Sequence, residues 1–332
     1  MEATKKEHTG KKTLLQPGPA IRPMIQKLMD NIRSVIYIDE KKLEYVIAAH
    51  IAGGHVMLAD SHGVGKTSLA RALAGSIQWG NNSGKDISFS RIQCTVDLLP
   101  QDILGYNKID GSKNAISFHK GPIFAHFVLC DEINLLTPKT QGSFFQAMEE
   151  QSVTVEGTTY NLPDPFFIIS TMNLRGAHLF PLPAPQLDRF MLQISLGFPR
   201  FEDEVNIIAQ HGRTDGWKNF KPVTNEKTLN EWKLLVDSIE IHPDVIDYIA
   251  RLVRETRTNP EVQTGASPRA GVKISRMARA LAFVRGQRYI TADTVKEIFI
   301  PACAHRLIMN DPVQSREKVL EDILKNIPVE RR

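Results

Sequence analysis

The residues best suited to chemistry lie in a glycine-rich segment between an apolar run at 55–59 and a helical pattern at 66–77. Glycines in such a turn let backbone N–H groups face an anion, and the following helix adds the positive end of its dipole. Lys66 can reach the β- and γ-phosphates, and the Thr67 hydroxyl can hold Mg²⁺. The segment therefore predicts a site for a nucleoside triphosphate such as ATP. Its expected contacts come from Ser61, His62, Gly63, Val64, Gly65, Lys66, Thr67 and Ser68.

Asp60 departs from the usual form of this motif, which has glycine at its first position. A carboxylate next to bound phosphates would weaken nucleotide affinity by charge repulsion. The alternative interpretation of the whole segment is a chance glycine-rich turn in an α/β domain.

A second segment, 126–132, supports the first because it reads as a buried strand that ends in two carboxylates. Asp131 would lie beside the phosphate loop and hold Mg²⁺, often through water. Glu132 would polarise the attacking water as general base. The alternative is a surface turn whose two acidic side chains are solvated.

The elements that must position these residues alternate between strand and helix. Strands are expected near 55–59, 87–94, 126–130, 166–171 and 190–195, and helices near 66–77, 97–104, 138–149 and 200–210, after two helices within 22–52. This alternation predicts an α/β fold with a mostly parallel sheet, whose ligand binds at the carboxyl ends of the strands. Hairpins are expected at 107–120 and 152–162. Residues 222–310 show helical periodicity and predict a small helical lid, with Ser267 and Thr291 as helix caps.

Length and composition agree with a soluble protein of about two domains. The chain has 332 residues, 42% of them hydrophobic and 23% charged, and a net charge of +4. We expect a disordered tail at 1–18, a nucleotide-binding core at 19–215, and a helical lid and tail at 216–332. No apolar run approaches the roughly 20 residues that span a bilayer, and the polar N-terminus does not read as a signal peptide. Three widely spaced cysteines suggest buried, reduced thiols and a cytoplasmic protein.

From Phe89 to Phe190 the chain resembles the MoxR branch of the AAA+ ATPases. The resemblance rests on the segments SRIQCTVDLLPQDILGY (90–106), GPIFAHFVLCDEIN (121–134), PKTQGSFFQAMEEQSVTVEG (138–157), LPDPFFIISTMN (162–173) and QLDRF (186–190). GASPRA (265–270) and RGQRYITADTVKEI (285–298) extend it toward the C-terminus. Asp at the first position of the phosphate loop also occurs in this family. The chain departs from the family pattern at His62, Leu135, Leu174 and the pair Ala184-Pro185.

The resemblance implies an AAA+ core with a parallel five-stranded sheet, a helix-2 insert, a hairpin before sensor 1, and a C-terminal all-α lid. In that family the two hairpins face a central pore. By the same resemblance Asn173 corresponds to sensor 1 and orients water or touches the γ-phosphate. Arg189 corresponds to the arginine finger that acts on a neighbouring subunit's nucleotide, with an intrachain ion pair as the alternative. Arg269 corresponds to sensor 2 and would reach the γ-phosphate of its own subunit, with a solvated first-turn arginine as the alternative.

We therefore expect a Mg²⁺-dependent ATPase that assembles as a ring, with a hexamer as the expected form, and remodels or activates a protein partner. The resemblance implies that this partner is a von Willebrand factor A-domain protein, and that hydrolysis changes the angle between core and lid. A nucleic-acid motor is a second hypothesis, which rests on Lys108, Lys113 and Lys120 in the first hairpin. A nucleotide-dependent scaffold that hydrolyses poorly is a third.

Overall fold

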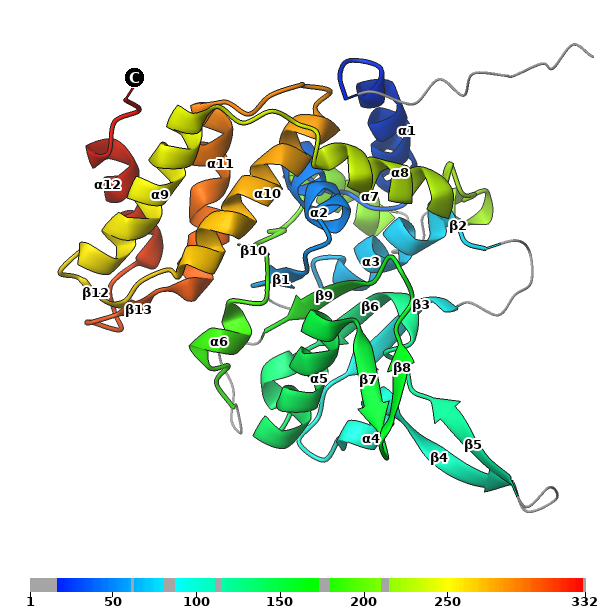
Figure 1. Ribbon diagram of the computed structural model, residues 1–332. Coiled ribbons are helices and arrows are strands. Elements are labelled where there is room, and N and C mark those ends of the chain that lie inside the picture. Colours follow the sequence, from blue (N-terminus) through cyan, green and yellow to red (C-terminus); the bar gives the residue numbers. More distant parts are fainter. Residues whose placement is uncertain are drawn as a thin grey trace, which may run out of the picture.

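A five-stranded parallel sheet forms the centre of the computed structural model, which describes residues 17–60, 63–80, 87–110, 115–172, 180–209 and 215–330 (Figure 1). Every pair of neighbouring strands is parallel, as the alternating pattern predicts. In spatial order the strands are β10 (Leu192–Ile194), β1 (Val56–Leu58), β9 (Phe167–Thr171), β6 (Ala125–Asp131) and β3 (Ile87–Gln93). The carboxyl ends of β1, β6 and β9 therefore lie at one edge of the sheet.

Both faces of this sheet are covered, which explains why its strands are apolar without interruption. All seven residues of β6 are buried. Alternate side chains point to opposite faces, so Phe127 and Leu129 join one hydrophobic cluster and Val128 and Cys130 join another.

The two clusters correspond to two helical layers. The first layer contains α1 (Ile21–Arg33), α2 (Glu40–Ile51) and α3 (Lys66–Gly75), and the second contains α4 (Pro100–Leu104) and α5 (Pro138–Glu150). The helix expected at 97–104 begins only at Pro100. Proline suits the first position of a helix but disfavours helical geometry in the residue before it.

Two antiparallel hairpins extend from the amino-end side of the sheet, away from the lid (Figure 1). They are β4–β5 (Gly105–Asp110 and Ala115–Lys120) and β7–β8 (Ser152–Val155 and Thr158–Asn161). Asn107 Nδ2 donates to Glu156 Oε2 over 2.7 Å and so joins one hairpin to the other. The expected turn at Asp110-Gly111 falls at the edge of the described residues, because 111–114 lie outside them.

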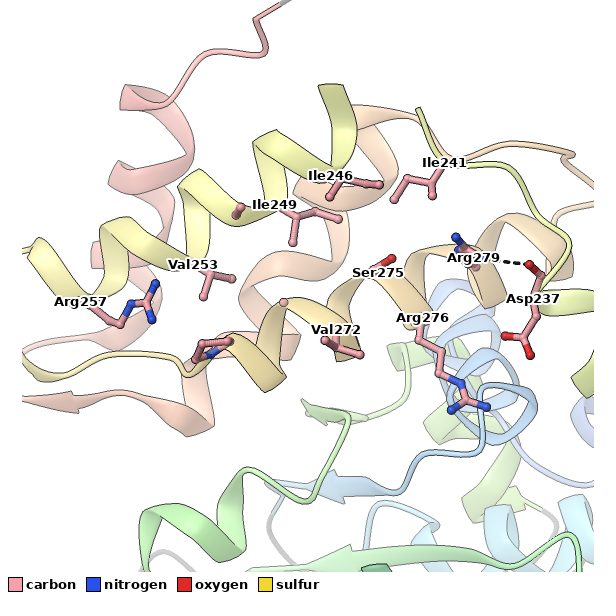
Figure 2. Close-up of a pocket in the computed structure, with 13 residues that line it drawn as sticks. Asp237, Ile241, Ile246, Ile249, Val253, Arg257, Val272, Ser275, Arg276 and Arg279 are labelled. Atoms are coloured by element: carbon pink, nitrogen blue, oxygen red, sulfur yellow. Dashed lines mark hydrogen bonds between the residues drawn. The ribbon is translucent and has the colours of Figure 1, made fainter. Parts of the chain in front are cut away.

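The C-terminal part is a helical lid, as expected, with one short antiparallel ladder. Its helices are α8 (Glu226–Val236), α9 (Pro243–Thr258), α10 (Pro268–Val284), α11 (Ala292–Cys303) and α12 (Arg316–Asn326), with the 3₁₀ turn η3 (Ala304–Arg306) and the ladder β12–β13 (Val262–Thr264 and Ile308–Met309). The short helix α6 (Ala184–Leu187) precedes β10. Between β10 and the lid helices the chain forms α7 (Phe201–Ala209), η2 (Asp215–Lys218) and β11 (Thr224–Asn225), which pairs with β2 (Ile77–Gln78). A further 3₁₀ turn, η1 (Ile133–Leu135), precedes α5. A groove lies between α9 and α10 (Figure 2).

Two details of the lid differ from the expectation. The helical periodicity of 222–310 puts Ile246 on one stripe with the buried Ile249, but the Ile246 side chain is exposed at the groove. Ser267 and Pro268 do begin α10, yet the Ser267 hydroxyl donates to Asp188 Oδ2 over 3.4 Å instead of capping the helix. Thr291 caps α11 as predicted, by accepting from the N–H of Thr294 over 3.2 Å.

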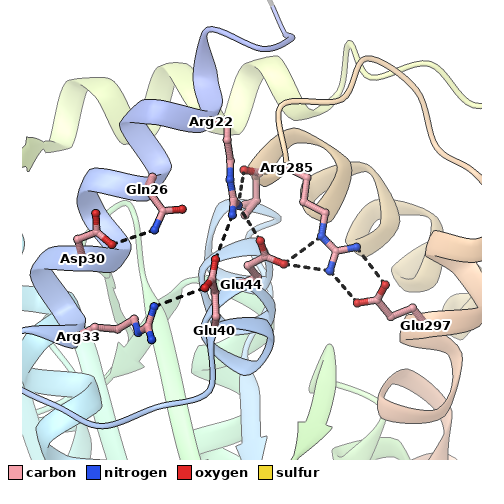
Figure 3. Close-up of polar contacts among 9 residues, drawn as sticks. Arg22, Gln26, Asp30, Arg33, Glu40, Glu44, Arg285 and Glu297 are labelled. Carbon is pink, nitrogen blue, oxygen red and sulfur yellow. Dashed lines mark hydrogen bonds and ion pairs between the residues drawn. The ribbon is translucent and has the colours of Figure 1, made fainter.

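The lid packs directly on the first helical layer. One hydrophobic cluster runs from β1 and β9 through α1 and α2 into α8–α12. Beside it, an ion-pair network connects four helices (Figure 3). Glu44 on α2 accepts from Arg22 on α1 over 2.6 Å and from Arg285 at the end of α10 over 2.9 Å. Arg285 also makes two hydrogen bonds, of 2.8 and 3.0 Å, to the Glu297 carboxylate on α11.

Candidate nucleotide site

The phosphate loop lies between β1 and α3, where the sequence places it. Gly63 and Gly65 adopt left-handed φ values of 86° and 85°, which glycine tolerates without strain. A Cβ at Gly65 would also lie 3.2 Å from Ile36 Cδ1. Lys66 begins α3, and its Nζ donates to the carbonyl of Asp60 over 3.0 Å. Val64 belongs to the described part of the loop, whereas Ser61 and His62 lie outside the described residues.

Thr67 and Ser68 lie in the first turn of α3, a helix of ten residues. The first N–H groups of a helix have no partner within it and carry a partial positive charge. The loop and the start of this helix therefore form an arrangement that can hold an anion, and the Thr67 hydroxyl belongs to it.

The Asp60 carboxylate is directed at the chain that follows β10. It accepts from the N–H groups of Leu196 and Gly197 over 2.7 and 3.2 Å, and also from the Ser195 hydroxyl. The Asp60 carboxylate is therefore hydrogen-bonded by groups of its own chain. The expected repulsion between Asp60 and bound phosphates is correspondingly reduced.

Asp131 ends β6 at the same edge of the sheet. Its carboxylate is largely buried and accepts from Arg91 Nε over 2.7 Å and from the Thr171 hydroxyl over 3.4 Å. Glu132 follows in the left-handed region at φ 57°, and its backbone N–H donates to Thr171 Oγ1 over 2.8 Å. Thr171, at the end of β9, thus holds the backbone of Glu132 and the carboxylate of Asp131 in place. Asn173, two residues further on, lies outside the described residues.

The oxygen donors at this edge fit Mg²⁺, which prefers hard oxygen ligands and keeps several from water or substrate phosphates. Asp131 and Thr67 offer oxygen donors of that kind. Among the described residues no group of three or more His, Cys, Asp or Glu side chains could hold a metal ion by itself. The chemistry of the site therefore suits an ion shared with a nucleotide.

A cavity of about 850 Å³ opens beside the phosphate loop, which is within the size range of small-molecule sites. Val64 of the loop lines it, together with Ile36, Tyr37, Leu196 and Phe198. Val64 was predicted from the sequence, whereas Ile36, Tyr37, Leu196 and Phe198 were missed. The available signal was the short apolar run Val35–Ile38 between α1 and α2, which does not by itself distinguish a ligand pocket from ordinary packing.

Arg189 and Arg269 lie together, but far from the loop of their own chain. Arg189 Nη2 lies 3.0 Å and Arg269 Nη1 lies 3.9 Å from the carboxylate of Glu149, at the end of α5. Arg189 also donates to the carbonyl of Phe145. The intrachain ion pair considered for Arg189 is thus present, with Glu149 as the partner.

Arg189 and the contact to the phosphate loop lie at opposite ends of β10. Arg189 precedes β10, whereas Ser195, which contacts Asp60, follows it. β10 has three residues, and residues in a strand rise about 3.3 Å each, so the strand alone separates its two ends by roughly 10 Å. In this structure Arg269 contacts Glu149, and its reach to the γ-phosphate of its own subunit stays a prediction.

Asp188 joins this region to the lid. Its carboxylate pairs with Arg306 Nε over 2.7 Å, and its carbonyl accepts from Lys273. The Arg306 side chain is buried, and its guanidinium also donates to the carbonyls of Ala302 and Phe190. Burial, and next to it the charge of Arg306, lower the pKa of Lys273 to about 8.

Comparison with known proteins agrees with this architecture. The family model described as ATPase family associated with various cellular activities (AAA) matches residues 55–192, and that of the AAA lid domain matches 254–327. A putative ATPase from Cytophaga hutchinsonii, known from its crystal structure, superposes with a TM-score of 0.85 at 28% identity, over 94% of this chain and 96% of that one.

Two curated relatives cover most of the chain. The uncharacterized protein YeaC of Bacillus subtilis is 33% identical over 94% of this chain and 97% of its own length. Chaperone MoxR1 of Mycobacterium tuberculosis is 31% identical over 86% of this chain and 76% of its own length. With the phosphate loop, the buried strand ending in Asp131 and the helical lid in place, these matches show that the chain belongs to the MoxR family of AAA ATPases.

Proposed function

We propose that this protein binds ATP with Mg²⁺, hydrolyses it at sites shared between the subunits of a ring, and uses the energy to remodel or activate a protein partner. The observation that carries the proposal is the separation of the two halves of the site. The phosphate loop and Asp131 lie at the carboxyl edge of the sheet, whereas Arg189 and Arg269 lie at the amino edge. A neighbouring copy in the same orientation would join one half to the other.

Each residue has a defined role in this proposal. The loop N–H groups and Lys66 hold the phosphates, while Thr67 and Asp131 hold Mg²⁺, which neutralises charge on the β- and γ-phosphates. Glu132 accepts a proton from the attacking water, and Asn173 orients that water. Arg189 and Arg269 supply positive charge to the nucleotide of the next subunit.

A hexameric ring is our proposal for the assembly, and a von Willebrand factor A-domain protein is our first candidate for the partner. The relative named chaperone MoxR1 supports a role on proteins. The three free, buried cysteines suit a reducing compartment, and we place the activity in the cytoplasm. In the part of the chain that the structure describes, no helix is long and apolar enough to cross a membrane.

The first hairpin favours a protein partner over nucleic acid. Ile109 and Ile116 face each other across its two strands and are 70% and 71% exposed. An exposed apolar pair suits contact with another protein, whereas a single-strand binder needs a basic groove with stacking aromatics. The scaffold hypothesis is weakened by the Asp60 carboxylate, which is engaged by its own subunit.

The proposal is tested by separating nucleotide binding from hydrolysis in two variants. Lys66→Ala should lose ATP binding, measured by fluorescence of a labelled ATP. Glu132→Gln should keep binding while phosphate release falls by about 10²–10⁴-fold, the usual contribution of a general base. Glu150→Gln, an exposed acid at the end of α5, serves as control and should leave both unchanged. Full hydrolysis by Glu132→Gln would contradict the proposed role of Glu132.

A further inference from the structure

Helix α7 presents an apolar stripe to solvent, which is unusual for a short helix. Phe201, Val205 and Ile208 recur at the spacing of one helical face, and Phe201 and Ile208 are 79% and 75% exposed. The helix buries none of its residues within the described part of the chain. A nine-residue helix is marginal in water without tertiary packing. The stripe therefore has the properties of a surface that is covered in an assembly.

The groove between α9 and α10 has a matching character. It encloses about 530 Å³ and is lined mainly by apolar side chains, Ile249 and Val253 from α9 and Val272 from α10 (Figure 2). Val272 is 68% exposed. Gly271 leaves space in the groove. A Cβ at this position would lie 3.8 Å from Ile249 and from Val253, in ordinary van der Waals contact, and would fill part of that space. Glycine in a helix interior costs about 1 kcal/mol relative to alanine.

Charges around the two surfaces are complementary. Arg257, Arg276 and Arg279 line the groove, together with one acid, Asp237, whose carbonyl accepts from Arg279 over 2.8 Å. The first turn of α7 is acidic, with Glu202, Asp203 and Glu204. Asp203 pairs with Arg200 over 3.1 Å, so Glu202 and Glu204 are the acids that we expect to face the arginines.

The two surfaces also lie at the two halves of the nucleotide site. Phe198, Arg200 and Asp203, at and just before α7, line the cavity beside the phosphate loop. The groove begins next to Arg269, because Arg269, Val272 and Arg276 follow one stripe of α10 at the spacing of i, i+3 and i+7. Placing the α7 of one copy in the groove of the next would therefore bring Arg269 toward the cavity beside that α7.

We propose that the apolar stripe of α7 docks in the α9–α10 groove of a second copy of this chain, and that this contact builds the ring. The contact is heterologous, since different surfaces of the two copies meet, and repetition of such a contact closes a ring when the rotation permits. The inference rests on the proposed function, because it names the surfaces that would unite the shared site.

Site-directed cross-linking tests the contact in the full-length chain. Val205→Cys and Val272→Cys place thiols on the two surfaces, and a short bismaleimide joins thiols that lie close together. The native cysteines are buried, and burial raises the pKa of the Cys130 and Cys303 thiols, so their background reaction is small. The control replaces the groove position by Val313→Cys on the lid, which is 91% exposed.

The pattern of products distinguishes the proposal from other assemblies. Neither single variant should cross-link alone, an equal mixture of the two should give covalent dimers, and the double variant should give a ladder of higher oligomers. The Val205→Cys/Val313→Cys double variant should give none of these. Dimers from a single variant would indicate an isologous contact and overturn the proposal, as would a double variant that stays monomeric under conditions where the protein assembles.

A second pair of variants keeps the test independent of cross-linking chemistry. Val272→Glu should reduce assembly with ATP, measured by analytical ultracentrifugation, and should reduce ATPase activity in parallel. Val313→Glu should leave both unchanged. A Val272→Glu protein that assembles normally and hydrolyses ATP would refute the docking surface while leaving the ring ATPase intact. Absence of any oligomer and of activity in the wild type would instead refute the proposed function itself.

Discussion

Asp60 shows how an atypical residue can be accommodated in a phosphate loop. Its backbone carbonyl accepts from Lys66, while its carboxylate is bound by the N–H groups of Leu196 and Gly197. The side chain thus connects the loop after β1 to the chain after β10. We interpret Asp60 as a structural residue of the loop.

Asp60→Ala should therefore lower stability without improving nucleotide affinity. It leaves two partly buried N–H groups without their acceptor, which costs about 1–2 kcal/mol. Thermal unfolding and titration with labelled ATP measure the two effects. Asp60→Asn, which keeps one acceptor oxygen, should lie between alanine and wild type in stability. A clear gain in ATP affinity on Asp60→Ala would mean that the carboxylate does repel the phosphates.

Arg91 forms an ion pair with Asp131 in this structure, and its guanidinium is half exposed. A positive charge at this distance competes with a divalent ion for the same carboxylate. The competition is modest, since partly exposed ion pairs contribute about 0.2–1 kcal/mol.

Arg91→Gln is accordingly expected to lower the Mg²⁺ concentration that gives half-maximal ATPase activity, by a factor of about 2–5. Arg91→Lys keeps the charge and should stay near the wild-type value. The measurement is a Mg²⁺ titration at saturating ATP. An unchanged requirement in Arg91→Gln would contradict the competition, and a higher one would show that Arg91 helps to place Asp131 for the ion.

At the scale of elements, the ion-pair network of Figure 3 holds α10 and α11 to α1 and α2. Burial by itself would raise the pKa of Glu297, but hydrogen bonds from Arg285 and Tyr45 outweigh it and lower this pKa to about 2. A carboxyl whose pKa is lower in the folded state stabilises the fold above its ordinary pKa of 4.5, and this stabilisation is lost as pH falls toward 2.

Glu297→Gln should therefore melt at a lower temperature than wild type at neutral pH, and the difference should shrink as pH falls from 4.5 toward 2. Asp293→Asn, which alters an exposed acid on the same helix, should show a small and flatter difference. Melting followed by circular dichroism across this pH range makes the comparison. A difference for Glu297→Gln that is constant with pH would contradict the role of its charge.

The β4–β5 hairpin is the element that we expect to meet the protein partner. Ile109→Asp with Ile116→Asp removes its exposed apolar pair without touching the nucleotide site. Basal ATPase activity should stay at the wild-type level, whereas stimulation by a partner protein should disappear. Lys108→Ala is the matched change of charge on the same strand. It should reduce the stimulation of ATPase activity more than the isoleucine changes do only if the ligand is a polynucleotide.

The sequence could predict the features that neighbouring residues determine, but not those that depend on the packing of distant segments. Gly63, Gly65 and Lys66 act within one turn, and the strand that ends in Asp131 is apolar throughout, so their elements could be read directly. The position of Arg269 depends on how α10 packs against α2 and on its ion pair with Glu149 of α5, which no local pattern encodes. The cavity lined by Tyr37 and Leu196 likewise joins segments far apart in the chain.

At the scale of the whole molecule, core and lid share one hydrophobic cluster and the buried Arg306–Asp188 ion pair. Relative domain motion is expected by default unless the interface is large and hydrophobic, and this one is continuous with the core. The sequence suggested that hydrolysis changes the angle between core and lid. The packing favours instead a subunit that moves as one body, with the change of geometry at the contact between subunits.

The central claim is that each ATPase site is built from two subunits, and mixing two inactive variants tests it most directly. Arg189→Ala should lower hydrolysis by about 10³–10⁵-fold, and Glu132→Gln should be nearly inactive. In equal mixture, about one quarter of the sites across a heterologous contact should combine an intact Glu132 with an intact Arg189. We predict that steady-state ATPase activity reappears in the mixture to that extent. Mixed assemblies that stay inactive, or an Arg189→Ala protein as active as wild type, would contradict the account.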